Sequence, residues 1–114
     1  MKVVINSDFG GFGLSDEAIR EYALRKGFTL VEEKCGEFGF TYFYKGEISD
    51  NTLFWEGDIE RNDADLVEIV ERLGSAADGR FSSLKVVEIP EGVDWQVMEY
   101  DGREWIAERH RTWS

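Results

Sequence analysis

The C-terminal part of the chain contains the strongest local signal in the sequence, a β-hairpin centred on Asp101 and Gly102. An Asp-Gly pair between two runs rich in aromatic and β-branched residues is typical of a two-residue type I′ turn. This turn fixes the register of the two strands. It brings Glu99 opposite Glu104, which is unfavourable unless a basic group lies nearby. The sequence therefore predicts antiparallel pairing at this end of the chain. The other predicted pairs are Met98 with Trp105 and Val97 with Ile106.

Two amphipathic segments predict the helices of the fold. Ser15 is a good N-cap for a first helix that runs to about Lys26 and stops at the glycine that follows. The second helix begins at Asn62 or Asp63, either of which can cap it, and ends at Gly74. Apolar residues recur at helical spacing in both segments, so each helix has one face to bury. These faces contain Ile19, Tyr22 and Ala23 with Ala18 in the first helix, and Leu66, Ile69, Val70 and Leu73 in the second.

Runs of β-branched and aromatic residues between these segments predict the remaining strands. The chain has 114 residues, which suffice for one core and are too few for two ordinary domains. No repeat, low-complexity tract or linker interrupts it. We therefore expect a single α+β domain, residues 1–114, in which two helices pack against a mostly antiparallel sheet. The expected strands cover residues 2–6, 28–34, 38–45 and 84–89, with a short apolar run at 52–55.

The charge of the chain restricts its partners. With 24 acidic and 13 basic side chains the formal net charge is -11, which repels a nucleic-acid backbone, so we expect neither DNA nor RNA as a partner. No apolar run is long enough to span a membrane, and no signal peptide is evident. The single cysteine, Cys35, excludes an intrachain disulfide. These features predict a soluble cytoplasmic protein that does not bind membranes.

Few residues in the sequence suggest catalysis or metal binding. The one histidine, His110, lies far from Cys35, so neither a transition-metal site nor a Cys/His catalytic pair is expected. The acidic residues are many, but they form no EF-hand pattern. Two of them can still meet in the fold as an acid-base pair, although nothing in the sequence selects a pair. We therefore expect a binding protein without a metal, a cofactor or enzymatic activity.

A glycine-rich segment at residues 10–13 lies between a predicted strand and a predicted helix, where a phosphate can bind. It lacks both a Walker lysine and a complete Gly-x-Gly-x-x-Gly pattern. Asp8 and Asp16 would also repel a phosphate. The sequence favours a tight turn that lets other backbone approach closely.

Aromatic residues alternate along the predicted strand at residues 38–45, so that four of them share one face. Such a face can stack nucleic-acid bases, but aromatic residues more often form a core or a subunit interface, and the acidic charge favours the latter two. The four residues are Phe38, Phe40, Tyr42 and Tyr44.

Arginine is the residue type most suited to binding a ligand in this acidic chain, because it binds phosphate bidentately and stacks on rings. Arg80 stands beside Phe81, which offers a positive charge next to an aromatic plane. Phe54 can stack on a base, and Asn62 and Asp63 can bind ribose hydroxyls. The structural alternative, which composition alone favours, is that Arg80 forms a surface ion pair and Phe81 belongs to the core.

Two parts of the sequence carry a resemblance to known proteins. The first comprises residues 3–6 and 10–15, and the second comprises 61–73, Gly79-Arg80-Phe81, 84–90, Glu99-Tyr100-Asp101-Gly102 and His110-Arg111-Thr112-Trp113. Together they resemble a set of small phage and prophage proteins. That set is similar to the phage anti-Thoeris sponge family, which sequesters cyclic ADP-ribose isomers. The resemblance covers well over half of the chain and leaves residues 34–52 unmatched.

The resemblance implies an anti-defence protein of the host cell cytoplasm that binds a TIR-derived glycocyclic ADP-ribose without cleaving it. It also implies a homo-oligomer, a dimer or a hexamer, with ligand pockets shared between subunits. Some members bind cyclic oligonucleotides at a separate site. The implied ligand contacts are Phe54, Asn62 or Asp63, and Arg80, followed by Phe81, Arg109 and Arg111.

Two other functions remain compatible with the sequence. The net charge of -11 suits an acidic inhibitor that mimics DNA and blocks a defence nuclease. Such a protein would gather its carboxylates on one surface. The other possibility is a small hydrolase of nucleotide signals, which would return its ligand as product.

Overall fold

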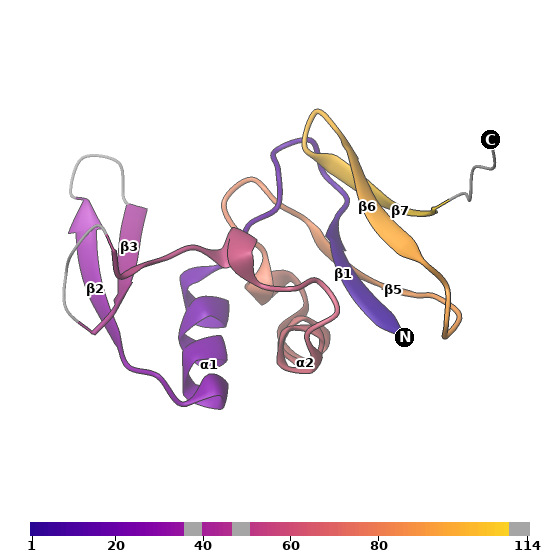
Figure 1. The fold of residues 1–114 in the computed structure, drawn as a ribbon. Helices are drawn as coiled ribbons and strands as arrows, with labels where there is room; N and C mark the ends of the chain where they lie inside the picture. The colour runs from indigo at the N-terminus through magenta and orange to yellow at the C-terminus, as the bar shows by residue number, and fades with distance from the viewer. Residues whose placement is uncertain (36–39, 47–50, 110–114) are drawn as a thin grey trace.

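The computed structural model describes residues 1–35, 40–46 and 51–109, and within them it shows an α+β fold in which all strand pairs are antiparallel (Figure 1). The elements in chain order are β1 (Lys2–Asn6), α1 (Asp16–Lys26), β2 (Leu30–Cys35), β3 (Phe40–Lys45), β4 (Leu53–Phe54), the 3₁₀ helix η1 (Glu56–Asp58), α2 (Ala64–Leu73), the 3₁₀ helix η2 (Gly74–Ala77), β5 (Leu84–Glu88), β6 (Trp95–Tyr100) and β7 (Arg103–Glu108). The predicted fold class, with two helices and a C-terminal hairpin, is confirmed.

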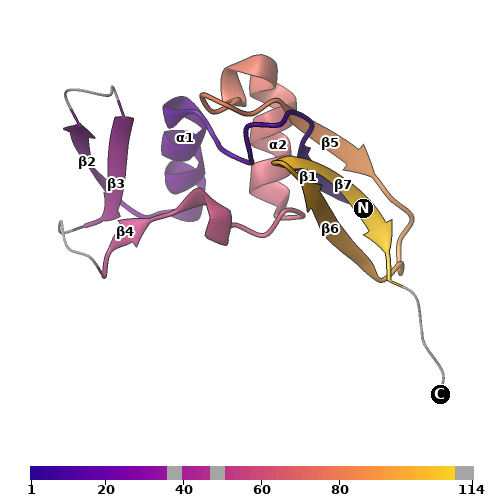
Figure 2. The same ribbon diagram turned by 90° about the horizontal axis from the view of Figure 1, so that it is seen from above.

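The described strands form three small sheets instead of one continuous sheet. The sheet β2–β3–β4 lies at one end of the molecule, and the pairs β1–β5 and β6–β7 lie at the other end (Figures 1 and 2). The helices α1 and α2 lie between these two ends. Small sheets need a partner layer to be stable. The helix α2 packs on β1 and β5, and the hairpin β6–β7 contacts β1.

The predicted helix caps are confirmed. The Ser15 hydroxyl accepts a hydrogen bond from the Ala18 N–H at 3.1 Å. Of the two candidate caps for α2, Asp63 is the one used, because its carboxylate accepts from the Asp65 N–H at 2.9 Å. Such caps satisfy N–H groups that have no partner within the helix. No helix among the described residues is long and apolar enough to cross a membrane.

The core lies between the two helices and the strands that cover them. The predicted apolar faces of both helices pack there, with Leu73 only partly buried, together with Val4 of β1 and Phe43 of β3. Phe43 is only 3% exposed, whereas its neighbour Tyr42 is 47% exposed. A core position is therefore wrong for Tyr42, because Phe43 on the opposite face of β3 is the residue buried in the core. The alternative prediction, a subunit interface, stays a prediction. Phe38 and the side chain of Phe40 lie outside the described part of the chain.

Ion pairs join the two helices at the surface. The Lys26 ammonium lies 2.9 Å from carboxylate oxygens of both Asp63 and Asp65. Hydrogen bonding to Asp63 is the largest cause of the raised pKa of Lys26. Asp63 thus caps α2 and also binds the last turn of α1, which is a structural role.

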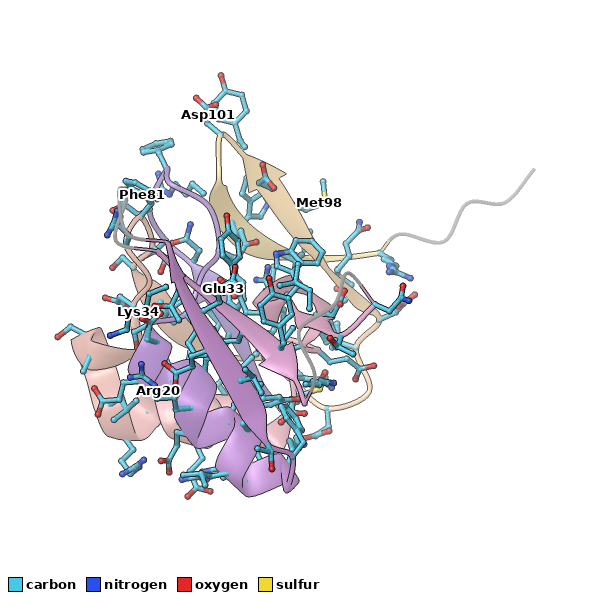
Figure 3. The ribbon with its side chains drawn as sticks, turned by 90° about the vertical axis from the view of Figure 1, so that its left-hand side faces the viewer. Arg20, Glu33, Lys34, Phe81, Met98 and Asp101 are labelled. Atoms are coloured by element: carbon cyan, nitrogen blue, oxygen red, sulfur yellow. The ribbon has the colours of Figure 1, made fainter. Side chains whose placement is uncertain are left out.

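The hairpin β6–β7 has the predicted register, with Met98 opposite Trp105 and Val97 opposite Ile106. Its turn has positive φ at both central residues, 55° at Asp101 and 88° at Gly102, as a type I′ turn requires. In Figure 3, Asp101 lies at the tip of the hairpin and Met98 lies along β6.

A buried ion pair attaches the hairpin to the rest of the molecule. Glu104 is 8% exposed and accepts two hydrogen bonds from the Arg61 guanidinium, at 2.6 and 2.9 Å. It also accepts from the Asn6 backbone N–H at 2.8 Å. The Arg61 guanidinium lies 3.6 Å from the ring centroid of Phe12. Arg61 is therefore the basic group that makes the pairing of Glu99 with Glu104 tolerable.

Candidate ligand-binding cleft

A cleft of about 660 Å³ lies between the sheet β2–β3–β4, the glycine-rich loop and the segment that follows η2. This volume is typical of sites for small molecules. Three of the predicted ligand contacts, Phe54, Arg80 and Phe81, line it. The other lining residues come from 10–16, Ile19, 41–43, Leu53, Trp55, Glu56, Asp78 and Gly79.

The glycine-rich loop forms one wall of the cleft because its glycines allow backbone to pack on backbone. A Cβ at Gly10 would overlap the carbonyl oxygen of Phe81. A Cβ at Gly79 would lie 2.9 Å from the carbonyl carbon of Gly13, closer than real Cβ atoms approach. The Gly79 N–H also donates to the Gly13 carbonyl at 3.2 Å. The prediction of a tight turn with close backbone packing is confirmed.

Side chains around the cleft fix the loop that carries Arg80. The Ser82 hydroxyl donates to the Gly13 carbonyl at 2.7 Å and accepts from the Gly79 N–H at 2.7 Å. The Asp78 carboxylate accepts from the Leu84 N–H at 2.8 Å. Arg80 is exposed and stands between these two anchored residues. These bonds hold the backbone that carries Arg80 beside the cleft.

The buried Asn6 ties this loop to the other end of the molecule. Its amide group donates to the carbonyls of Asp8 and Gly102 and accepts from the N–H of Ser83 at 2.9 Å. The amide is therefore hydrogen-bonded to three loops, at Asp8, Ser83 and Gly102, that are distant from one another in the sequence. Hydrogen-bonded groups of this kind, with 0% exposure, hold loops in one arrangement.

Large apolar side chains are exposed together on the walls of the cleft, and grouped exposure of this kind is typical of binding sites. They are Tyr42 and Leu53 at 47% exposure and Trp55 and Phe81 at 62%. Phe81 stands at the edge of the molecule in Figure 3, so the alternative that it belongs to the core is wrong.

Phe54 and Trp55 differ in role, since one fills the core and the other is open to a ligand. The sequence alone did not show which residue has which role. The Phe54 ring packs in the core, with ring centroids 6.1 Å from Tyr22 and 5.8 Å from Phe28. The exposed Trp55 ring instead lies against Gly57, where an added Cβ would be 2.6 Å from the ring. Trp55 is therefore the residue of this pair that offers an open aromatic face to the cleft.

Glu56 is a cleft residue that the sequence did not single out. It is partly buried and lines the cleft immediately after Trp55. Burial raises the pKa of the Glu56 carboxyl, against the opposing effect of hydrogen bonds from its own N–H and that of Leu14. The nearby Asp16 carboxylate adds to the rise in pKa. In the sequence, Glu56 is one of 24 acidic residues, and nothing there distinguishes it from the others. Its burial in the folded protein is the property that identifies it.

The other predicted contacts lie away from the cleft. Asn62 is exposed, with its amide nitrogen 3.7 Å from the Met1 sulfur, and Asp63 caps α2. Arg109 lies 3.8 Å from the Asp94 carboxylate. Arg111 lies outside the described residues. Asn62 and Arg109 instead line a shallower hollow of about 720 Å³ beside β6, together with residues 57–61 and 95–97.

The described residues contain no cluster of three or more histidine, cysteine or acidic side chains that can hold a metal ion. Comparisons with known proteins do not identify the site: no protein family, no curated protein and no solved structure matches the chain.

Proposed function

We propose that this protein binds and sequesters a cyclic ADP-ribose isomer, the TIR-derived signal of a bacterial defence system, and does not cleave it. The observation that carries the proposal is the gathering of Arg80, Phe81 and Trp55 around one cleft of about 660 Å³. The fold brings Trp55 to the adjacent pair Arg80 and Phe81, and the chemistry of the three side chains matches the parts of such a nucleotide. The resemblance to phage sponge proteins supports the same conclusion.

The cleft supplies complementary groups for each part of the ligand. Aromatic rings stack on purine bases, and stacking contributes about 1–3 kcal/mol per base in other nucleotide-binding proteins. Trp55 and Phe81, both 62% exposed, offer such rings. The Arg80 guanidinium suits the pyrophosphate, because arginine binds phosphate oxygens bidentately. A local positive charge is needed because the net charge of the chain is -11.

The hydrogen bonds of one hydroxyl group at the cleft are consistent with capture without cleavage. The Ser15 hydroxyl lines the cleft, but it donates to the Ala76 carbonyl at 2.6 Å and accepts from Ala18 as the cap of α1. It is thus committed to the fold instead of serving as a nucleophile. In the proposal the protein acts in the host cell cytoplasm as a homo-oligomer, a dimer or a hexamer. A second site for cyclic oligonucleotides belongs to the same proposal.

The test is a capture-and-release experiment. The protein is mixed with TIR-generated cyclic ADP-ribose isomers, free ligand is removed, the protein is denatured by heat, and the released molecule is analysed by mass spectrometry. We expect intact ligand. Arg80→Ala should weaken binding about 10- to 100-fold, because a hydrogen-bonded charge pair is lost. Arg72→Ala, which removes the same charge from the exposed surface of α2, should leave capture unchanged.

The outcomes separate the proposal from its alternatives. Released ligand that is chemically altered would indicate a hydrolase, a function that the raised pKa of the cleft carboxyl Glu56 also suits. No bound nucleotide, together with a nuclease that co-purifies, would indicate an acidic DNA mimic. Either result contradicts sequestration without cleavage, and unchanged capture by the Arg80→Ala protein contradicts the assignment of this cleft.

A further inference from the structure

Glu56 occupies a distinctive place in the cleft. It is the first residue of η1, follows Trp55 directly and lies against the glycine-rich loop. Its carboxylate oxygen Oε1 is 3.6 Å from the position that a Cβ on Gly13 would occupy. The backbone N–H of Leu14 acts to lower the pKa of the same carboxyl, against the larger effect of burial. The side chain is therefore held on the cleft wall in a defined position.

The three carboxylates of the cleft differ in what surrounds them. Asp78 binds the Leu84 N–H, and Asp16 lies exposed in the first turn of α1. Glu56 is partly buried, and none of the ion pairs among the described residues involves it. A carboxylate that is desolvated without a cation is costly, and a ligand that brings hydrogen-bond donors reduces this cost.

We propose that Glu56 determines the specificity of the cleft by accepting hydrogen bonds from a ribose hydroxyl group of the bound nucleotide. This inference rests on the proposed function. In a nucleotide the ribose lies between the base and the phosphates. Glu56 has a corresponding position, since it follows the stacking residue Trp55 and its carboxylate lies beside Gly13. The other side of Gly13 packs on Gly79, the residue before Arg80.

The chemistry of the group selects ribose over the other parts of the ligand. A carboxylate repels phosphate oxygens, and the flat faces of a purine are better matched by Trp55 and Phe81. Ribose hydroxyls are donors, and an acidic side chain on a ribose hydroxyl is a recurring arrangement in dinucleotide-binding proteins. The cleft is thus expected to prefer ribonucleotide ligands over analogues that lack this hydroxyl.

The test combines a variant of the protein with variants of the ligand. Binding of a cyclic ADP-ribose isomer is measured by calorimetry beside two deoxy analogues, one lacking a free hydroxyl on each ribose. For the unaltered protein we expect one analogue to bind about 10- to 100-fold more weakly than the parent. Glu56→Gln, which keeps the shape and removes the charge, should bind the parent more weakly and no longer distinguish it from that analogue. Glu60→Gln, the same change at a nearby exposed residue outside the cleft, should retain the discrimination.

The possible results distinguish this inference from the proposed function. Suppose that the unaltered protein binds the parent ligand, and that removing the ribose hydroxyl weakens binding equally in the unaltered protein and in Glu56→Gln. The inference about Glu56 is then overturned, and sequestration stands. If the unaltered protein binds none of the three ligands, both are overturned. Should Glu56→Gln fail to fold by circular dichroism, Glu56→Asp replaces it. That variant withdraws the carboxylate by one methylene and should lose the same discrimination.

Discussion

The two ends of the molecule bury a glutamate in different ways. At the hairpin, Glu104 is 8% exposed and receives two hydrogen bonds from Arg61 and one from the Asn6 N–H. At the cleft, Glu56 is partly buried, and none of the ion pairs among the described residues involves it. Burial consequently raises the pKa of Glu56, which means that its charged form is disfavoured in the folded protein.

This difference indicates which carboxylate serves the fold and which serves a ligand. A buried charge that is fully paired holds two elements together, and Glu104 holds β7 against β1 and the start of α2. A desolvated carboxyl without a paired cation lowers stability, and such groups are concentrated at functional sites. The comparison therefore supports a structural role for Glu104 and a binding role for Glu56.

Removing the cation at the hairpin end should produce the largest effect. Arg61→Ala leaves Glu104 buried without its guanidinium, and we expect a loss of about 3–5 kcal/mol in the free energy of unfolding. Urea denaturation measures it. Amide hydrogen exchange should show that β6 and β7 lose protection before the helices do.

The double variant Arg61→Met with Glu104→Leu is the control for this prediction. It removes both charges together, so we expect a smaller loss of stability than for Arg61→Ala, with about 1–3 kcal/mol remaining because the buried Asn6 N–H loses its carboxylate acceptor. A cost for the double variant equal to that of Arg61→Ala would show that packing, and not the ion pair, attaches the hairpin.

A second prediction compares a glycine at each end. Gly102 has φ of 88°, and a Cβ there would overlap the backbone of Phe9 and Gly11. Gly102→Ala should therefore destabilise the protein by about 1–3 kcal/mol. The atoms nearest to a Cβ at Gly57 belong to the Trp55 ring, which can rotate, so for Gly57→Ala we expect a smaller loss of stability and a changed tryptophan fluorescence. Equal losses at the two positions would mean that the Trp55 ring is held as firmly as the backbone.

The elements of the fold could be predicted because their signals are local. Ser15 and Asp63 cap helices through atoms two or three residues away, and the turn at Asp101 and Gly102 sets the register of its own two strands. The choice between Tyr42 and Phe43 for the core could not be predicted. Alternation assigns the two residues to opposite faces of β3, but only the position of α1 decides which face is buried.

The cleft was predicted in part for the same reason. Arg80 and Phe81 are adjacent in sequence, so their combination is visible before folding. Asn62 and Asp63 lie at the N-terminus of α2, and neither residue lines the cleft. Glu56 could not be selected, because its significance comes from desolvation by segments distant in sequence, among them the glycine-rich loop.

The smallest expected effect concerns stability at the cleft end. The folded pKa of Glu56 lies above its unfolded value, which is about 4.3. The folded protein thus binds this proton more tightly, and that contribution to stability is lost as pH rises through the folded pKa. Glu56→Gln, which has no charge at any pH, should be more stable than the unaltered protein at pH 7.

The pH dependence of this gain provides the sharper measurement. The difference between the two proteins should disappear below about pH 4, where Glu56 is neutral as well. The pKa of Asp63 shifts in the opposite direction, because hydrogen bonds from Lys26 and two N–H groups outweigh its desolvation and lower its pKa. Asp63 is present in both proteins, so its contribution cancels in the stability difference between them. Thermal unfolding from pH 3 to pH 8 gives the comparison. A Gln variant that gains stability while it loses ribose discrimination would show that Glu56 is kept for the ligand. A loss of stability at pH 7 would instead give Glu56 the same structural role as Glu104.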